Sequence, residues 1–179
     1  MSPNQDPQNL NFRSDGHFYP YVVSFFTSLA GLQAFVDPKN PMNIRPNQRL
    51  PLEGHVHRKF SISTHDLFKQ FQSKTLDSKF ITARLCCMLT NSTYESVQKI
   101  KPSSPEFEFF RHVRNASSHG NQFFFSRNEP RRKAEWRSKD IALNPKGDAH
   151  PLYNSVCFFD YLGPADLILL LWDIEQLLS

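Results

Sequence analysis

Hydrophobic positions recur with helical spacing over two long parts of the chain. Between residues 15 and 36 the apolar side chains fall three or four positions apart, at Phe18, Val22, Phe25, Phe26, Leu29, Leu32 and Phe35. This spacing places them on one wide face, which predicts a helix. Residues 78–98 predict a second long helix, with its inward face at Phe80, Ile81, Leu85, Met88 and Leu89. Residues 1–14 lack such a pattern, so we expect them to be a flexible N-terminal tail.

Local signals predict where the other elements begin and end. Prolines between residues 38 and 51 predict a long connection that is not helical. Residues 54–62 suit a short extended segment, after which Ser63 or Thr64 caps a short amphipathic helix. A further helix should start at 103–106, where serine can cap, proline suits the first turn and glutamate suits the helix dipole. That helix should end at Gly120.

The C-terminal third predicts a hairpin followed by a buried helix. Residues 134–143 and 153–159 are rich in aromatic and branched side chains, and turn-forming residues 144–148 separate them. We therefore expect a small β-hairpin insertion within 134–160. The last helix, 167–178, follows Gly163-Pro164 and is apolar nearly all round, so it must be buried in the core or against another chain. The prediction is a mainly α fold, with a single helical domain over residues 15–179.

Composition narrows the class of protein. Phenylalanine accounts for 17 residues, so we expect a core built from aromatic rings. The three cysteines suggest neither a disulfide framework nor a zinc finger, which favours a reducing cytoplasm. The N-terminus lacks the pattern of a secretory signal. Residues 17–36 carry no Asp, Glu, Lys or Arg, but polar residues and Pro20 interrupt them, so we expect no membrane partner.

The positive charge is concentrated in one stretch. Residues 111–139 carry a net charge of +6, whereas the whole chain carries +4, so the remaining residues sum to −2. A local positive field favours a phosphate-bearing partner such as a nucleic acid. A solvated basic loop with no partner is the alternative.

This basic stretch contains the segment Arg114-Asn115-Ala116-Ser117-Ser118-His119. The segment combines a permanent cation, an amide and a titratable imidazole, which are groups suited to binding and catalysis. On a helix Asn115 is the neighbour of both Arg111 and His119. Arg114 and His119 differ by about 140° of rotation and about 7.5 Å of rise, so they would meet only if the helix unwinds at Gly120 or if a second chain brings its own cluster alongside. In the alternative reading, Arg114 pairs with a carboxylate and His119 caps the helix end.

The segment 114–119 resembles the signature of the HEPN superfamily (higher eukaryotes and prokaryotes nucleotide-binding domains). In that signature four to six residues separate an Arg from a His, and a polar residue, often Asn, commonly follows the Arg. The aromatic-rich helix that carries it, the hairpin and the closing helix are also similar to that family, over residues 15–178. The resemblance implies a HEPN-like helical bundle of the stand-alone plasmid or defence type. It also implies a homodimer in which two motifs line one cleft.

The resemblance further implies a metal-independent endoribonuclease without a cofactor, leaving 2′,3′-cyclic phosphate and 5′-hydroxyl ends. Arg114 would bind the scissile phosphate, and His119 would handle the 2′-hydroxyl or the leaving oxygen. Asn115 would orient the imidazole or contact phosphate. The residues expected to contact RNA are Arg111, His112, Ser118, Arg127, Arg131, Arg132 and Lys133.

The resemblance suggests a cytoplasmic toxin or antiphage effector, with one departure from the family. In HEPN toxins that pair with a nucleotidyltransferase antitoxin, a Tyr typically lies two positions beyond the motif His. Here that position is Asn121. Neutralisation by nucleotide transfer to a tyrosine is therefore disfavoured, which leaves another antitoxin or regulatory protein, or a self-regulating arrangement, as the open alternatives.

Other classes of function remain open or are disfavoured. The main alternative is a non-catalytic helical module that binds RNA, nucleotide or a partner protein. A third reading is a structural dimer in which Arg114 and His119 are internal ion-pair partners. His55 and His57 lie on the same side of an extended segment, but two ligands do not make a metal site. Neither a serine-hydrolase elbow nor a glycine-rich phosphate loop occurs in the sequence.

Overall fold

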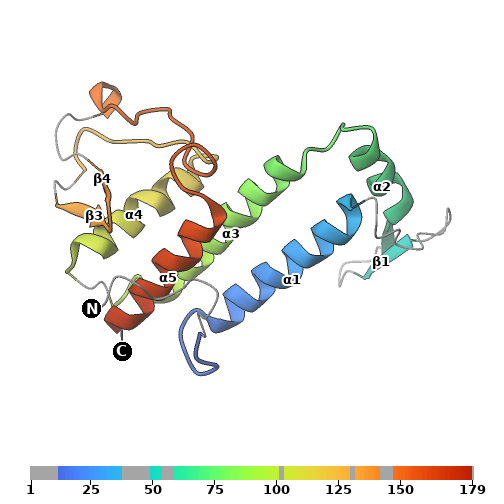
Figure 1. Cartoon of the computed structure of the whole chain (residues 1–179), viewed down its shortest axis with the longest axis horizontal. Coiled ribbons are helices and arrows are strands. Elements are labelled where there is room, and N and C mark those ends of the chain that lie inside the picture. The colour runs from blue at the N-terminus through green and yellow to red at the C-terminus, as the bar shows by residue number, and fades with distance from the viewer. Residues whose placement is uncertain are drawn as a thin grey trace. The chain divides into compact units, whose positions relative to one another are not determined.

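The computed structural model describes residues 12–37, 49–53, 59–100, 103–129, 132–141 and 147–178. Within these ranges the chain forms five α-helices and two antiparallel hairpins (Figure 1), which confirms the predicted mainly α fold. The chain divides into two compact units, a large one of residues 1–25 and 83–179 and a small one of residues 26–82. Residues 1–11 of the predicted tail lie outside the described ranges.

The small unit joins parts of two long helices to a hairpin and a short helix. It contains the end of α1 (Tyr19–Val36), β1 (Arg49–Glu53), β2 (Lys59–Ser63), α2 (Thr64–Gln72) and the start of α3 (Ser78–Val97). The two strands are antiparallel, with Arg49 opposite Ser63. Ser63 caps α2, because its hydroxyl accepts a hydrogen bond of 3.1 Å from the Asp66 amide. The predicted start of this helix is thus confirmed.

Helix α1 has the length and composition of a membrane span. Its 18 residues have a mean hydropathy of 1.2, and only Val22 and Phe25 among them are buried. Signal sequences and the core helices of soluble proteins meet the same criterion. Length and composition therefore assign no location to α1, and the expected lack of a membrane partner stays a prediction.

The large unit is built around α4 (Pro105–Ser118) and α5 (Pro164–Leu178). Figure 1 shows α4 beside β3 (Ala134–Trp136) and β4 (Lys139–Ile141), with α5 close to α4. The fully buried side chains of these two helices are Phe109, Phe110, Val113, Ala116, Leu167, Leu170, Leu171 and Ile174. Tyr94 of α3 contacts Phe107 and Phe110 through ring centroids 5.7 and 5.5 Å apart. The predicted aromatic core is therefore confirmed, and one face of α5 is buried in it, whereas Gln176 and Leu177 are exposed.

A β-hairpin forms in the predicted region, but the predicted pairing of 134–143 with 153–159 is wrong, because both observed strands lie within 134–143. The strands pair within residues 134–141, with Ala134 opposite Ile141. Residues 153–159 form turns and isolated bridges instead. The reason is that Asn121 uses their backbone groups: its carbonyl accepts from the Cys157 amide at 2.9 Å and its side chain accepts from the Phe158 amide at 2.8 Å. Residues 142–146 lie outside the described ranges.

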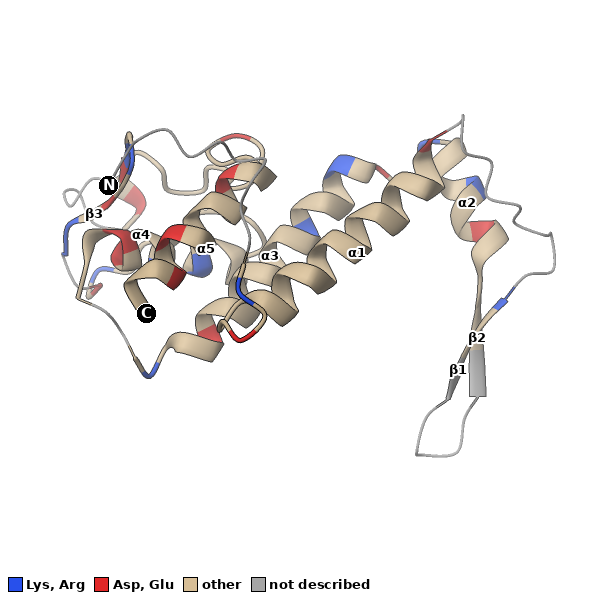
Figure 2. Ribbon diagram, turned by 60° about the horizontal axis from the view of Figure 1, so that its bottom comes forward, with Lys and Arg blue, Asp and Glu red and all other residues tan. Residues whose placement is uncertain are grey.

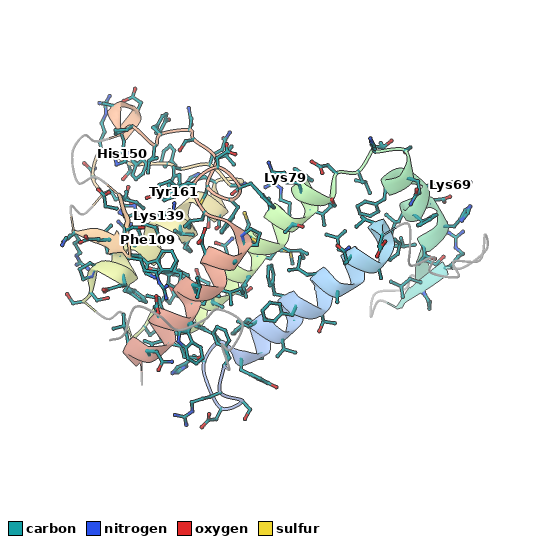
Figure 3. All side chains as sticks on the ribbon, viewed as in Figure 1. Lys69, Lys79, Phe109, Lys139, His150 and Tyr161 are labelled. Carbon is teal, nitrogen blue, oxygen red and sulfur yellow. The ribbon has the colours of Figure 1, made fainter. Side chains whose placement is uncertain are left out.

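Aromatic contacts fasten the hairpin and the following segment to α4. Phe109 of α4 lies 5.9 Å from Trp136 and 6.2 Å from Tyr161, measured between ring centroids. Lys139 lies over the Tyr161 ring at 4.8 Å and donates a hydrogen bond of 2.8 Å to the Tyr161 carbonyl (Figure 3). The backbone that follows α4 is thus held by the same rings that fill the core.

All three cysteines are free thiols in the interior of the large unit. Cys86 and Cys87 lie on α3, and Cys157 lies in the segment before α5. Burial raises the pKa of Cys86 to about 12, and it also raises the pKa of Cys87 and of Cys157. These thiols are packing groups, because the reactive thiolate form is strongly disfavoured.

Candidate functional site

Helix α4 places the Arg114 to His119 segment at its C-terminal end. Its start is confirmed, since Pro105 is the first helical residue and the Ser104 hydroxyl accepts a hydrogen bond of 3.1 Å from the Phe107 amide. Its end is also confirmed, because His119 is the C-cap and Gly120 has a φ of +73°. Glycine adopts this left-handed conformation at little cost. Local sequence alone thus determines where the segment stops being helical.

The two faces of α4 differ in exposure. Phe109, Phe110, Val113 and Ala116 are fully buried on one face. On the other face Arg114 and Asn115 are half-buried, whereas Ser118 and His119 are exposed. The polar side chains are therefore carried by a backbone that core packing holds in place.

The Arg114 guanidinium is held from two sides. Its Nη2 donates a hydrogen bond of 2.6 Å to Glu95 Oε1 on α3, and its central carbon lies 5.3 Å from the Tyr94 ring centroid. Its Nε is buried and has no hydrogen-bond partner among the described residues. The side chain is still 32% exposed, so part of the guanidinium is open to a ligand.

A second pair of residues joins the same two helices. The Ser118 hydroxyl donates a hydrogen bond of 2.9 Å to Asn91 Oδ1. Asn91 and Glu95 lie about one turn apart on α3, and Ser118 and Arg114 lie about one turn apart on α4. We call these four residues the α3–α4 seam. The seam borders an open depression lined by Tyr21, Asn91, Ser92, Glu95 and Ser96.

Another group of charged side chains on and near α4 forms a network centred on Arg111. Arg111 donates to Glu108 Oε1 at 2.7 and 2.9 Å and to Glu129 Oε1 at 2.7 Å. Asn115 Nδ2 donates to the same Glu129 oxygen at 3.1 Å, so the predicted neighbours Arg111 and Asn115 meet at one carboxylate. Burial opposes the Arg111 charge, but the bonds to the two carboxylates outweigh burial and raise its pKa. The Arg111 guanidinium thus forms its hydrogen bonds with carboxylates of the protein itself.

His112 is a buried neutral member of this network. Arg111 Nη2 lies 3.2 Å from His112 Nε2. Because arginine only donates, Nε2 must accept, which leaves the imidazole proton on Nδ1. Burial, with the charge of Arg111 and the neighbouring His150, lowers the pKa of His112 to about 3. This side chain, expected to contact RNA, lies inside the protein with 7% of its surface exposed.

His119 stands apart from Arg114. Its exposed imidazole stacks on the Phe124 ring, with centroids 4.5 Å apart, and its amide donates a hydrogen bond of 3.0 Å to the Asn115 carbonyl. No hydrogen bond or ring contact joins Arg114 and His119 within the part of the chain that the structure describes. This agrees with the separation expected for residues five apart on a helix.

The basic stretch is partly neutralised by acidic residues. Lys133 pairs with Glu135, and Arg137 pairs with Asp173 of α5 at 2.9 Å. Figure 2 shows acidic segments on α4 and α5 as well as basic ones in this part of the chain. Arg127 and Arg132 are exposed, and neither forms an ion pair with a described residue. Arg131, also expected to contact RNA, lies outside the described ranges.

Sequence reasoning missed the acidic half of the site. Glu95 bonds Arg114, Glu108 and Glu129 bond Arg111, and Asn91 bonds Ser118. One signal was present, because Asn91 and Glu95 are four residues apart and so form a polar stripe on one helix. That this stripe faces the motif was not predictable, since it depends on how α3 packs on α4.

Potential metal ligands are not gathered in the described residues. No group of three or more His, Cys, Asp or Glu side chains there is arranged to hold a metal ion. His55 and His57 lie outside the described ranges. The expectation of no metal site stays a prediction.

Comparison with known proteins leaves the chain without an assigned relative. No protein-family model, curated protein or solved structure matches it.

Proposed function

We propose that this chain is a metal-independent endoribonuclease of HEPN type, which cleaves RNA to 2′,3′-cyclic phosphate and 5′-hydroxyl ends. The observation that carries the proposal is the placement of Arg114 and His119 at the accessible end of one rigid helix. Arg114 is oriented by Tyr94 and Glu95 but keeps part of its guanidinium exposed. A planar, permanently charged fork of this kind suits a phosphate whose charge grows during cleavage.

His119 supplies the proton-transfer group. Its imidazole is exposed and is held against Phe124, which limits its rotation without covering it. Asn115 Nδ2 gives one of its two hydrogens to Glu129, so its second hydrogen and its Oδ1 remain for other partners. Asn115 then orients the His119 imidazole through Oδ1 or contacts phosphate through its second amide hydrogen.

Because Arg114 and His119 do not meet within one chain, the proposal includes a homodimer. A second copy would place its His119 near the Arg114 of the first, so that each site takes residues from both chains. Arg127, Arg131, Arg132 and Lys133 would hold the RNA backbone beside it. We further propose a cytoplasmic toxin or antiphage effector, with an antitoxin or regulatory protein as a second partner.

One observation favours a different function. Glu95 already neutralises Arg114, and His119 has no contact with it in the described structure. This arrangement suits a non-catalytic helical module that binds RNA, nucleotide or a partner protein. In that case binding would depend on the exposed cations Arg127 and Arg132 rather than on His119.

The proposal is tested by incubating purified protein with a mixed RNA substrate in EDTA and identifying the product ends. We expect Arg114→Ala and His119→Ala to abolish cleavage and to leave the oligomeric state unchanged. Arg137→Ala is a matched control for Arg114, because Arg137 also pairs with one carboxylate and lies 5.4 Å from an aromatic ring. His17→Ala controls for the loss of an exposed imidazole.

The outcomes separate the readings. Cyclic phosphate ends that disappear in both motif variants but not in the controls would support the nuclease. A folded wild-type protein that binds RNA without cutting it would favour the binding module. Equal activity in His119→Ala and wild type would refute the assigned site.

A further inference from the structure

The proposed reaction needs one more proton-transfer group than the motif supplies. Formation of a cyclic phosphate requires a base for the 2′-hydroxyl, an acid for the leaving 5′-oxygen and a cation at the phosphate. Arg114 is the cation, and a single imidazole serves as either the acid or the base in one step. The second group must come from outside the Arg114 to His119 segment.

Glu95 lies where such a group is needed. In RNA the 2′-hydroxyl is adjacent to the phosphate that it attacks, so its base must lie beside the cation that binds the phosphate. Glu95 Oε1 is 2.6 Å from Arg114 Nη2, and the Glu95 side chain is 46% exposed. No other carboxylate is bonded to Arg114 in the described part of the chain.

The Glu95 carboxylate is also oriented. Arg114 donates to Oε1, and the Gln98 side chain donates to Oε2. Each carboxylate oxygen offers two lone-pair positions, so each retains one for a further donor. When Arg114 donates to a phosphate instead, Glu95 Oε1 loses its bond to Arg114 and lies next to the sugar.

We propose that Glu95 is the general base of the reaction, an inference that rests on the proposed nuclease function. The 2′-hydroxyl gives its proton to Glu95 as its oxygen attacks phosphorus. The bond between phosphorus and the 5′-oxygen breaks, and that oxygen takes a proton from the His119 imidazolium. Glu95 ends protonated and His119 neutral, and exchange with water restores both groups.

The depression beside the seam then holds the nucleotide whose 2′-hydroxyl reacts. Its lining is polar: Ser92 is exposed, and Asn91 uses its side-chain oxygen for Ser118, which leaves its amide hydrogens as donors. Hydroxyl and amide groups of this kind suit a ribose and a base edge. Dependence on the 2′-hydroxyl makes the substrate RNA rather than DNA.

The test compares Glu95→Gln, Glu95→Asp and the control Glu135→Gln for cleavage of labelled RNA in EDTA across a range of pH. Glu135 is a good match because it also pairs with one cation and is 43% exposed. Glutamine keeps an oxygen for Arg114 but does not accept the proton. Thermal unfolding of each variant establishes that it is folded.

We expect kcat of Glu95→Gln to fall by about 10²- to 10⁴-fold with little change in KM, which is the range for loss of a general base. We also expect the wild-type rate to fall at acidic pH, where a general base is protonated, and we expect this fall to be absent in Glu95→Gln. Glu95→Asp should keep that pH dependence and lose less activity, and Glu135→Gln should match wild type.

Each other outcome overturns the inference in a distinct way. Wild-type-like cleavage by Glu95→Gln would show that the carboxylate is not the base. Faster cleavage and tighter RNA binding would show that Glu95 restrains Arg114 instead. A folded wild-type protein that cuts no RNA would refute the proposed function itself, and the inference with it.

Discussion

Acidification should destabilise the fold through one buried side chain, His112. Its Nε2 accepts a hydrogen bond from Arg111, so a proton on that atom would break the bond and place two positive groups together. Glu108 Oε1 at 3.8 Å and Glu129 Oε1 at 3.5 Å would attract the proton, but burial and Arg111 outweigh them. The folded protein therefore keeps His112 neutral, whereas the unfolded chain protonates it freely.

The size of this effect follows from the pKa of His112, which falls from its ordinary value of 6.5 to about 3 on folding. Stability is unaffected above pH 6.5, because His112 is then neutral in both states. As the pH falls below 6.5, the unfolded state binds a proton that the folded state does not, at about 1.4 kcal/mol per pH unit. Between pH 7 and pH 5 this amounts to about 2 kcal/mol of lost stability.

The assay is urea unfolding at pH 7 and pH 5 for wild type and His112→Gln. Glutamine still accepts from Arg111 but does not titrate, so the loss of stability between the two pH values should shrink by about 2 kcal/mol. Exposed His17→Gln controls for the removal of one imidazole. If His112→Gln and wild type lose the same stability, His112 is not held neutral and the reasoning is wrong.

Two further substitutions test the packing and the start of α4. Phe110→Ala should lower the free energy of unfolding by about 3–5 kcal/mol, because this fully buried ring contacts Phe18, Tyr94 and Phe107. A change below about 1 kcal/mol in urea unfolding would contradict that packing. Ser104→Ala should cost about 1 kcal/mol by removing the cap of α4. Exposed Ser103→Ala is its control, and equal thermal stability of the two variants would argue against the cap.

The limits of α4 were predictable because they depend on neighbours in sequence. Ser104 caps an amide three residues ahead, and Gly120 has the φ that stops the helix. The start of α2 at Ser63 follows in the same way. Such contacts are local, so the sequence that specifies them can be read without knowing the fold.

Long-range partners were not predictable. The strand expected at 153–159 was lost to hydrogen bonds with Asn121, more than thirty residues earlier. Glu95 lies nineteen residues from Arg114, and Glu129 eighteen from Arg111. A polar stripe on α3 indicates a surface, but only helix packing decides what that surface meets.

The basic stretch illustrates the same limit for charge. Its composition indicates a positive field, yet Glu108, Glu95 and Asp173, all outside the stretch, pair with its arginines. The net charge of residues 111–139 counts only the charged side chains within that stretch. The field at the surface also depends on acids that the fold brings in from elsewhere.

Because all three cysteines are buried, the folded chain should be unreactive toward thiol reagents. Cys86, Cys87 and Cys157 can be alkylated only when the core around them opens, so the labelling rate measures local opening rather than surface chemistry. A cysteine introduced at an exposed position such as Ser92 would then be the first to react. A spectroscopic probe can thus be attached at a single site beside the α3–α4 seam without removing any of the natural cysteines.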